Sequence, residues 1–290
     1  MKNIFIVGVG RSGTSLLQSM LDSHSKVEFL PETGILRKFV FKNPNKEIEN
    51  KKEYLDLLLK DKRVGRLNIL KLEECSENSI SRVNHYNNYL DSVTSKTTTY
   101  IGDKDPRLLD YVLKLNDLFP NSKIIHIIRD PRSVVASRIK ADWSKKWPFF
   151  LHPMVYSMQM KKGRTTSKSL SKENYLEIKY EELINDPENV LKVICKFLSL
   201  EFENNMLSFS DSSKRLVSKE ELQWKKETIG PILTNNDSKW KLGLNNYQIS
   251  LIQKVCKTEM LQLNYEFEKT PSNGLLENVK INLYLMLSKI

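Results

Sequence analysis

A glycine-rich turn near the start of the chain constrains the fold more than any other feature. The stretch IFIVGVGRSGTSLLQSML, residues 4–21, places this turn between a short β-branched run and an apolar-periodic helix. Backbone N–H groups of such a turn, with the N-terminus of the following helix, can hold phosphate oxygens. The nucleotide-triphosphate loop reads G-x-x-x-x-G-K-[ST], with a lysine that reaches the β- and γ-phosphates. Gly8, Gly13 and Ser15 fit this frame, but Thr14 stands in the lysine's place. The turn therefore predicts an anion site without its own lysine, or else a plain strand–helix connection.

Strands and helices alternate along the rest of the chain. Residues 26–30 form a short strand candidate, and strand–turn–helix patterns follow at 97–120, 123–140 and 175–200. Such alternation predicts right-handed βαβ units and a mostly parallel sheet. We therefore expect an α/β fold with a P-loop-like parallel sheet flanked by helices.

The 290 residues are long enough for one large domain, and we predict a single domain over 1–290. Residues 35–98 are polar and rich in lysine and asparagine, with helical stretches such as KKEYLDLLLK. We interpret this segment as a helical insertion over the sheet, and residues 266–290 as a C-terminal helical tail.

A second anion-binding candidate follows a predicted strand in the stretch IIRDPRSVVAS. Ser137 lies eight residues after Arg129, which is about two helical turns, so both side chains can face one way. Together they could grip a phosphate; alternatively Arg129 pairs with Asp130 and Ser137 simply packs in the helix. Gly13, Lys104 and Arg129 all fall where predicted strands end, and ligands of parallel sheets bind at that edge. The sequence thus predicts one shared site.

Charge and cysteine content narrow the class of protein. The chain has 46 Lys and Arg against 35 Asp and Glu, which gives a formal charge of +11. This excess indicates either an anionic ligand, substrate or membrane face, or simply a lysine-rich solvated surface. The three cysteines lie far apart and the four histidines lack metal-ligand spacing, so we expect neither disulfides nor a metal. We expect no nucleic-acid partner.

The first strand begins close to Met1, which leaves no room for a signal peptide, and no apolar run reaches the roughly 18 residues of a membrane span. These features predict a cytoplasmic protein, with peripheral membrane contact still open.

Both motifs resemble those of a known enzyme family. GVGRSGTS resembles the 5′-phosphosulfate loop of sulfotransferases that use 3′-phosphoadenylyl sulfate (PAPS), and IIRDPRSVVAS resembles their 3′-phosphate motif. KDPR, YEELINDPENVL and SKWK are further matches, and the details are most similar to the protein-tyrosine and bacterial branch. The similarity runs from about residue 3 to 265 and leaves 35–98 unmatched. It implies PAPS as donor, adenosine 3′,5′-bisphosphate (PAP) as product, and no metal.

The resemblance also assigns residues to the donor. It implies that the 5′ side of PAPS is held by Arg11, Ser12, Gly13, Thr14 and Ser15, and the 3′-phosphate by Arg129 and Ser137. Tyr180 in KYEEL and Lys239 in SKWK match residues near the nucleotide, although QWKKETIGPILTNND before Lys239 departs from the family pattern.

Sulfuryl transfer needs a base and a cation at the developing negative charge. By resemblance, Glu32 in LPETG is the base and Lys104 in DKDPR lies near the leaving group, and Arg11, on the 5′ side of PAPS, is also counted as catalytic. Alternatively, Glu32 caps a helix near Gly34, and Lys104 pairs with a neighbouring aspartate.

Two histidines complete the candidates. His152, in a predicted loop, is the reserve base, and His126, in mid-strand, is predicted to be buried structure.

The resulting hypothesis is a PAPS-dependent sulfotransferase acting on a hydroxyl or amine, with a carbohydrate or small metabolite as acceptor. Residues 35–98 and 141–175 are predicted to choose the acceptor. The alternatives are a P-loop-type nucleotide or small-molecule kinase, and a non-catalytic protein that binds anions or sulfated glycans.

Overall fold

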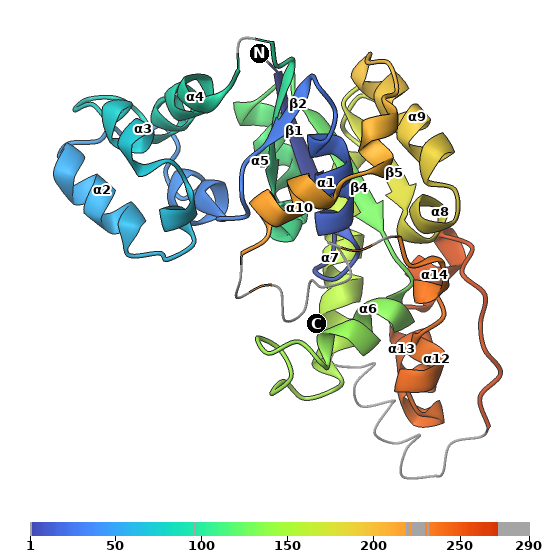
Figure 1. Cartoon of the computed structure of the whole chain (residues 1–290). Helices are drawn as coiled ribbons and strands as arrows, with labels where there is room; N and C mark the ends of the chain where they lie inside the picture. The colour runs from blue at the N-terminus through green and yellow to red at the C-terminus, as the bar shows by residue number, and fades with distance from the viewer. Residues whose placement is uncertain (1, 96, 219–220, 222–229, 231, 272–290) are drawn as a thin grey trace.

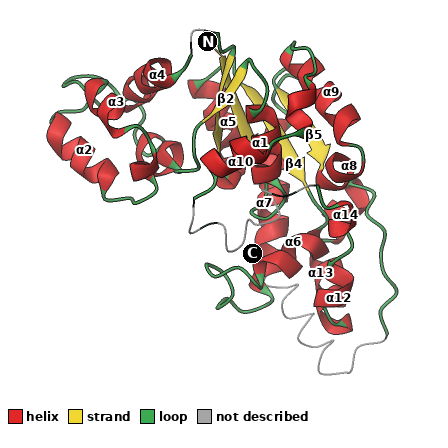
Figure 2. Cartoon of the chain, viewed as in Figure 1, coloured by secondary structure: helices red, strands yellow, loops and turns green. Residues whose placement is uncertain are grey.

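The computed structural model describes residues 2–95, 97–218, 221, 230 and 232–271. Its centre is a five-stranded sheet in the order β2-β3-β1-β4-β5, in which every neighbouring pair is parallel. The strands are β1 (Lys2–Val7), β2 (Val27–Phe29), β3 (Tyr100–Lys104), β4 (Lys123–Ile128) and β5 (Tyr175–Lys179). The predicted P-loop-like parallel sheet flanked by helices is therefore confirmed (Figures 1 and 2). The carboxyl ends of all five strands lie at one edge of the sheet, and Glu32, Lys104, Arg129 and Tyr180 lie at or just after these ends.

Helices cover both faces of the sheet because successive residues of β1 point to opposite sides. Ile4 and Ile6 pack in one apolar cluster, and Phe5 and Val7 pack in the other. The first cluster is covered by α1 (Thr14–Asp22), α8 (Tyr180–Asn185), α9 (Pro187–Leu198) and α10 (Ser210–Leu216). The second is covered by α5 (Val112–Leu118), α6 (Pro131–Arg138), α7 (Leu151–Ser167) and α13 (Asn246–Val255). The site edge thus belongs to a three-layer arrangement, with helices packed on both faces of the sheet.

The segment between β2 and β3 is built from short helices that stand to one side of the sheet (Figure 1). They are a π-helical turn (Leu36–Val40), α2 (Lys51–Leu59), a 3-10 turn (Val64–Arg66), α3 (Ile69–Glu74) and α4 (Arg82–Val93). Side chains of Asn50, Asn68 and Ser81 accept hydrogen bonds from the first turns of α2, α3 and α4. Tyr86 of α4 packs in the same apolar cluster as Phe5, so these helices share the core of the sheet.

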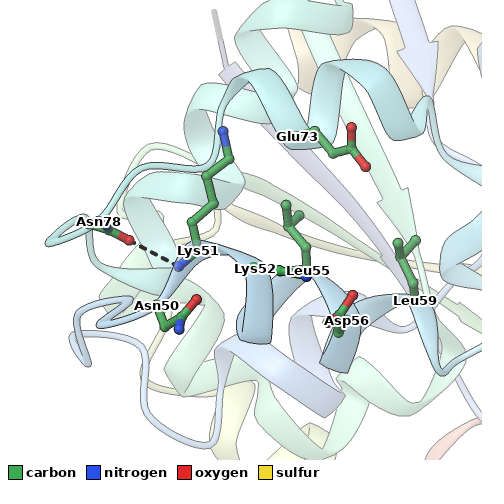
Figure 3. A pocket seen from close by; sticks show the side chains of 8 residues that line it. All are labelled: Asn50, Lys51, Lys52, Leu55, Asp56, Leu59, Glu73 and Asn78. Carbon is green, nitrogen blue, oxygen red and sulfur yellow. Dashed lines mark hydrogen bonds between the residues drawn. The ribbon is translucent and has the colours of Figure 1, made fainter.

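A hollow of about 540 Å³ lies within this segment, between α2 and α3. Figure 3 shows Leu55, Asp56 and Leu59 on α2, with Glu73 on α3. The Lys51 N–H donates to the Asn78 side chain at its rim, over 3.0 Å. None of the residues around this hollow belongs to the predicted site.

The remaining elements are short turns and helices. They are 3-10 turns at Pro106–Tyr111, Asn204–Leu207 and Thr234–Asn236, and helices α12 (Trp240–Gly243) and α14 (Lys257–Gln262). Residues 266–271 carry no helix, and the rest of the predicted tail, 272–290, lies outside the described residues. Within the described part of the chain, no helix is long and apolar enough to cross a membrane. The three cysteines are free thiols.

Candidate functional site

The glycine turn after β1 has the backbone of an anion cradle. Arg11 and Gly13 both adopt left-handed conformations, with φ of 83° and 94°, and alternation into this region turns successive N–H groups toward one concave side. A side chain on Gly13 would place its Cβ 2.2 Å from the ring of Tyr180, so glycine is required there by both conformation and space. Thr14 and Ser15, both buried, begin α1 directly after the turn.

The lysine that the turn lacks is supplied by the neighbouring strand. Lys104 ends β3 opposite Ile6 of β1, and its side chain is fully buried. Its Nζ donates to Ser15 Oγ over 3.2 Å, next to the position that a P-loop lysine would occupy. A cation from β3 therefore serves the same turn that a local lysine serves in nucleotide triphosphatases.

Glu32 lies just beyond β2 and forms an ion pair with Lys104. Lys104 therefore has a salt-bridge partner from the end of β2, and the N–H of Ile35 donates to Thr33 Oγ1 over 3.2 Å. The side chain of Glu32 stays 18% exposed while that of Lys104 is 1% exposed. A carboxylate is thus held at the cradle with one side open toward solvent.

Arg11 and Ser137 join the two sequence motifs. Arg11 Nε donates to Ser137 Oγ over 2.8 Å, although 126 residues separate them. The predicted 5′ and 3′ phosphate motifs are therefore parts of one site.

Arg129 follows β4 and reaches the same turn. Its guanidinium donates to the carbonyls of Arg11 (3.2 Å) and Asn236 (2.9 Å) and lies 4.1 Å from the ring centre of Tyr180. Asn236 also donates from its side chain to the Tyr180 hydroxyl, over 2.7 Å. These contacts fix the planar guanidinium, a group suited to bidentate phosphate binding, beside the glycine turn.

Two buried polar atoms of this cradle have no hydrogen-bond partner in the described residues. They are Ser12 Oγ and Arg129 Nε. Buried polar groups nearly always find partners, so each such atom calls for an explanation. Both can donate, and an anion between the turn and β4 would satisfy them.

Behind Lys104, the carboxyl of Asp103 points to the other side of β3. It accepts from the Tyr86 hydroxyl over 3.2 Å, and its other oxygen has no partner in the described residues. Burial, and then the nearby Asp105, raise the pKa of Asp103 to about 7.

The two histidines have different outcomes. His126 is buried in β4 and its Nδ1 lies 2.6 Å from the Tyr175 hydroxyl, so the structural role is confirmed. The prediction of a loop for His152 was wrong, because it lies in the first turn of α7, where it is buried against Trp147. Burial, with the cation of Arg138 beside it, lowers the pKa of His152 to about 4. A buried imidazole of such low basicity is poorly suited to general-base work.

Lys239 lies at the exposed start of α12, outside the hydrogen bonds described above. The segment before it is tied to α6 by a hydrogen bond from Ser133 Oγ to the Asp237 carbonyl, 2.8 Å. Most of QWKKETIGPILTNND falls outside the described residues. Asn236 within it was missed from sequence, since it stands in the stretch that departs from the family pattern. Among the described residues, no group of three or more His, Cys, Asp or Glu could hold a metal ion.

Comparison with known proteins gives one consistent result. The family model described as "Sulfotransferase family" matches residues 3–204. Protein-tyrosine sulfotransferase 2 of Gallus gallus is 28% identical over 220 residues, 70% of this chain and 53% of that protein. Carbohydrate sulfotransferase 1 of Danio rerio is 25% identical over 195 residues, 61% of this chain and 46% of that protein. The chain spans about half the length of these curated relatives.

Solved structures agree on the fold. The sulfotransferase domain from the curacin biosynthetic pathway superposes with a TM-score of 0.65 at 22% identity, covering 92% of this chain and 99% of that one. The sulfotransferase domain from the Synechococcus PCC 7002 olefin synthase gives 0.62 at 18% identity, covering 99% and 96%.

Proposed function

Because this chain belongs to the sulfotransferase family, we propose that it transfers a sulfuryl group from PAPS to a hydroxyl or amine of an acceptor, with release of PAP. One observation supports this most: the Lys104 ammonium contacts both Ser15 of the phosphate cradle and the Glu32 carboxylate. A cation for the leaving group and a base for the acceptor thus stand at the same turn.

The residues of the cradle would hold the donor by its two anionic ends. The turn and Ser15 suit the phosphosulfate, and Arg129 with Ser137 suits the 3′-phosphate, since guanidinium and hydroxyl groups donate to phosphate oxygens. Tyr180 packs on the turn at Gly13 and under Arg129, a place that fits the nucleoside between the two anions.

The chemistry assigned to the protein is proton removal and charge stabilisation. Glu32 takes the proton from the acceptor hydroxyl as the oxygen bonds to sulfur. Lys104 and Arg11 stabilise the negative charge that develops on the departing phosphate oxygen. The positioning of these groups on strand ends is expected to supply most of the rate, as in phosphoryl transfer.

The acceptor we favour is a carbohydrate or a small metabolite. The insertion borders the base directly, because Arg66 donates to the Glu32 carbonyl over 3.3 Å. A second hollow, of about 450 Å³, includes Arg66, Leu30 and Pro31 and runs along β2 just before Glu32. This arrangement supports an acceptor-side role for residues 35–98.

Donor binding and turnover test the proposal together. PAP should raise the melting temperature of the protein in the presence of a chelator, because a ligand that binds only the native state stabilises it. Radiolabelled sulfate should pass from PAPS to an acceptor in a carbohydrate and metabolite panel. A kinase would instead need ATP with Mg²⁺ for an equal shift, and a non-catalytic anion-binding protein would bind PAP without any transfer.

A further inference from the structure

Two tryptophans are exposed beside the cradle. Trp143 and Trp147, called the indole pair below, lie in residues 139–150 between α6 and α7, at the lower end of the molecule in Figure 1. They are 46% and 41% exposed, and their rings lie 6.0 Å apart at 87°. Large apolar side chains that are exposed together, rather than singly, mark interaction sites.

Two buried side chains, Arg138 and His152, pack against the indole pair. The guanidinium of Arg138, itself only 3% exposed, lies 5.0 Å from the Trp143 ring and 5.6 Å from the Trp147 ring. Trp147 stacks on His152 at 6.0 Å and 26°. Ser144 Oγ donates to the Arg138 carbonyl over 2.6 Å, which links the segment to the end of α6. A ligand that binds such rings loses little affinity to the ordering of side chains.

The pair stands at the opposite end of the glycine turn from Tyr180. A Cβ on Gly10 would lie 3.9 Å from Trp143 and 3.8 Å from an Arg138 nitrogen, whereas a Cβ on Gly13 would meet Tyr180. Trp143 therefore borders the glycine turn at the end away from Tyr180, within reach of a group bound to that turn.

We propose that the indole pair binds a sugar ring of the acceptor, and that this acceptor is an anionic glycan; the inference rests on the proposed function. The face of an indole is electron-rich and attracts C–H bonds that carry partial positive charge. The C–H bonds on the face of a pyranose are of that kind because each carbon bears oxygen. A phenol ring presents an electron-rich face of its own and gains less from stacking.

The charge of the segment favours an acidic glycan over a neutral one. Residues 139–150 carry Lys140, Lys145 and Lys146 against a single acid, Asp142, which pairs with Lys145 at 2.6 Å. Cations around an apolar platform attract polyanions and make binding depend on salt.

Direct binding to PAP-saturated protein tests the inference. An unsulfated chondroitin hexasaccharide, which carries uronic acids, should bind in isothermal titration calorimetry, and cellohexaose should bind more weakly. Trp143→Ala and Trp147→Ala should each raise the hexasaccharide Kd by about tenfold, the usual scale for a buried tryptophan contact. Trp143→Phe should lose less, and Leu70→Ala, an apolar change at a more exposed position on α3, should lose nothing.

The PAP-induced melting shift keeps the two proposals separate. If the shift persists while both alanine variants bind the hexasaccharide as tightly as the wild type, the indole pair has no role. If a tyrosyl peptide binds in its place and loses affinity in these variants, the acceptor class is wrong. Loss of the PAP shift in the wild-type protein overturns the proposed function instead. An alanine variant that loses its PAP shift is misfolded, and Trp143→Phe then decides.

Discussion

Arg129→Ala is the substitution that most directly tests whether the cradle recognises the 3′-phosphate of its ligand. Arg129 is 8% exposed, and its guanidinium stacks on Tyr180 and donates to two backbone carbonyls, so its loss affects both folding and binding. Leaving buried carbonyls without a donor costs about 1–3 kcal/mol of folding free energy. A lower melting temperature is therefore expected whether or not Arg129 binds phosphate.

Ligand discrimination separates the two effects. A hydrogen bond to a charged group contributes about 1.5–3 kcal/mol, which corresponds to roughly 10- to 150-fold in Kd. PAP and adenosine 5′-monophosphate differ only in the 3′-phosphate, so the ratio of their affinities isolates that group, as in a double-mutant cycle. We expect the preference for PAP to fall by this factor in Arg129→Ala and to fall less in Arg129→Lys, which keeps the charge and loses the fork.

Calorimetry with both nucleotides at low and moderate salt provides the measurement. Equal losses of affinity for PAP and for adenosine 5′-monophosphate would show that Arg129 only supports the structure. Wild-type affinity of Arg129→Ala for both nucleotides would remove the 3′-phosphate site from this position altogether.

Three further predictions concern the base, the turn and a buried acid. Glu32→Gln should bind PAP normally and lose at least about 10²-fold in kcat, whereas Glu188→Gln, at an exposed position on α9, should keep its turnover; near-full activity of Glu32→Gln would move the base elsewhere. Gly13→Ala should abolish PAP binding and lower the melting temperature, because the position has φ of 94° and no space for a Cβ; Gly65→Ala, with nothing within 4 Å, is the matched control and should be neutral. The pKa of Asp103 is raised by burial from 3.8 to about 7, so folding stability from this group is complete below about pH 4 and is lost as the pH rises toward 7. Asp103→Asn should therefore be more stable than the wild type above pH 7, by at most about 4 kcal/mol, with a difference that vanishes near pH 4 in urea titrations; parallel curves would contradict this.

The features that were predicted well from sequence are those contained within one short stretch of the chain. The turn from Gly8 to Ser15 and the stretch from Arg129 to Ser137 each combine a strand end with a helix start, and periodicity indicates both. Because parallel strands end at one edge, their convergence followed from fold class alone. The hydrogen bond from Arg11 to Ser137 shows that the two motifs do meet at that edge.

Sequence could not give contacts that depend on tertiary packing. His152 looked like a loop residue because Pro148 and Pro153 flank it, yet Pro153 falls in the first turn of α7, where proline is tolerated. The role of Asn236 depends on a segment of the late chain that returns to Arg129 over 107 residues. Nothing in its own neighbourhood signals that return.

The absent lysine of the turn shows why a sequence pattern can lack a residue whose cation is still present in the folded site. A P-loop lysine is found by pattern because it is adjacent to the serine that it accompanies, whereas Lys104 reaches Ser15 from 89 residues away. Because it lies at the end of β3, Lys104 also forms an ion pair with Glu32. A P-loop lysine on α1 needs no such carboxylate partner. One ammonium therefore holds the cradle and the carboxylate together, and the effects of substituting Lys104 and Glu32 should not add. Under the proposed function, removing Lys104 would take away both the cation beside Ser15 and an ion-pair partner of Glu32 in a single step. One lysine at the end of β3 thus links the glycine turn to the carboxylate that we propose as the base.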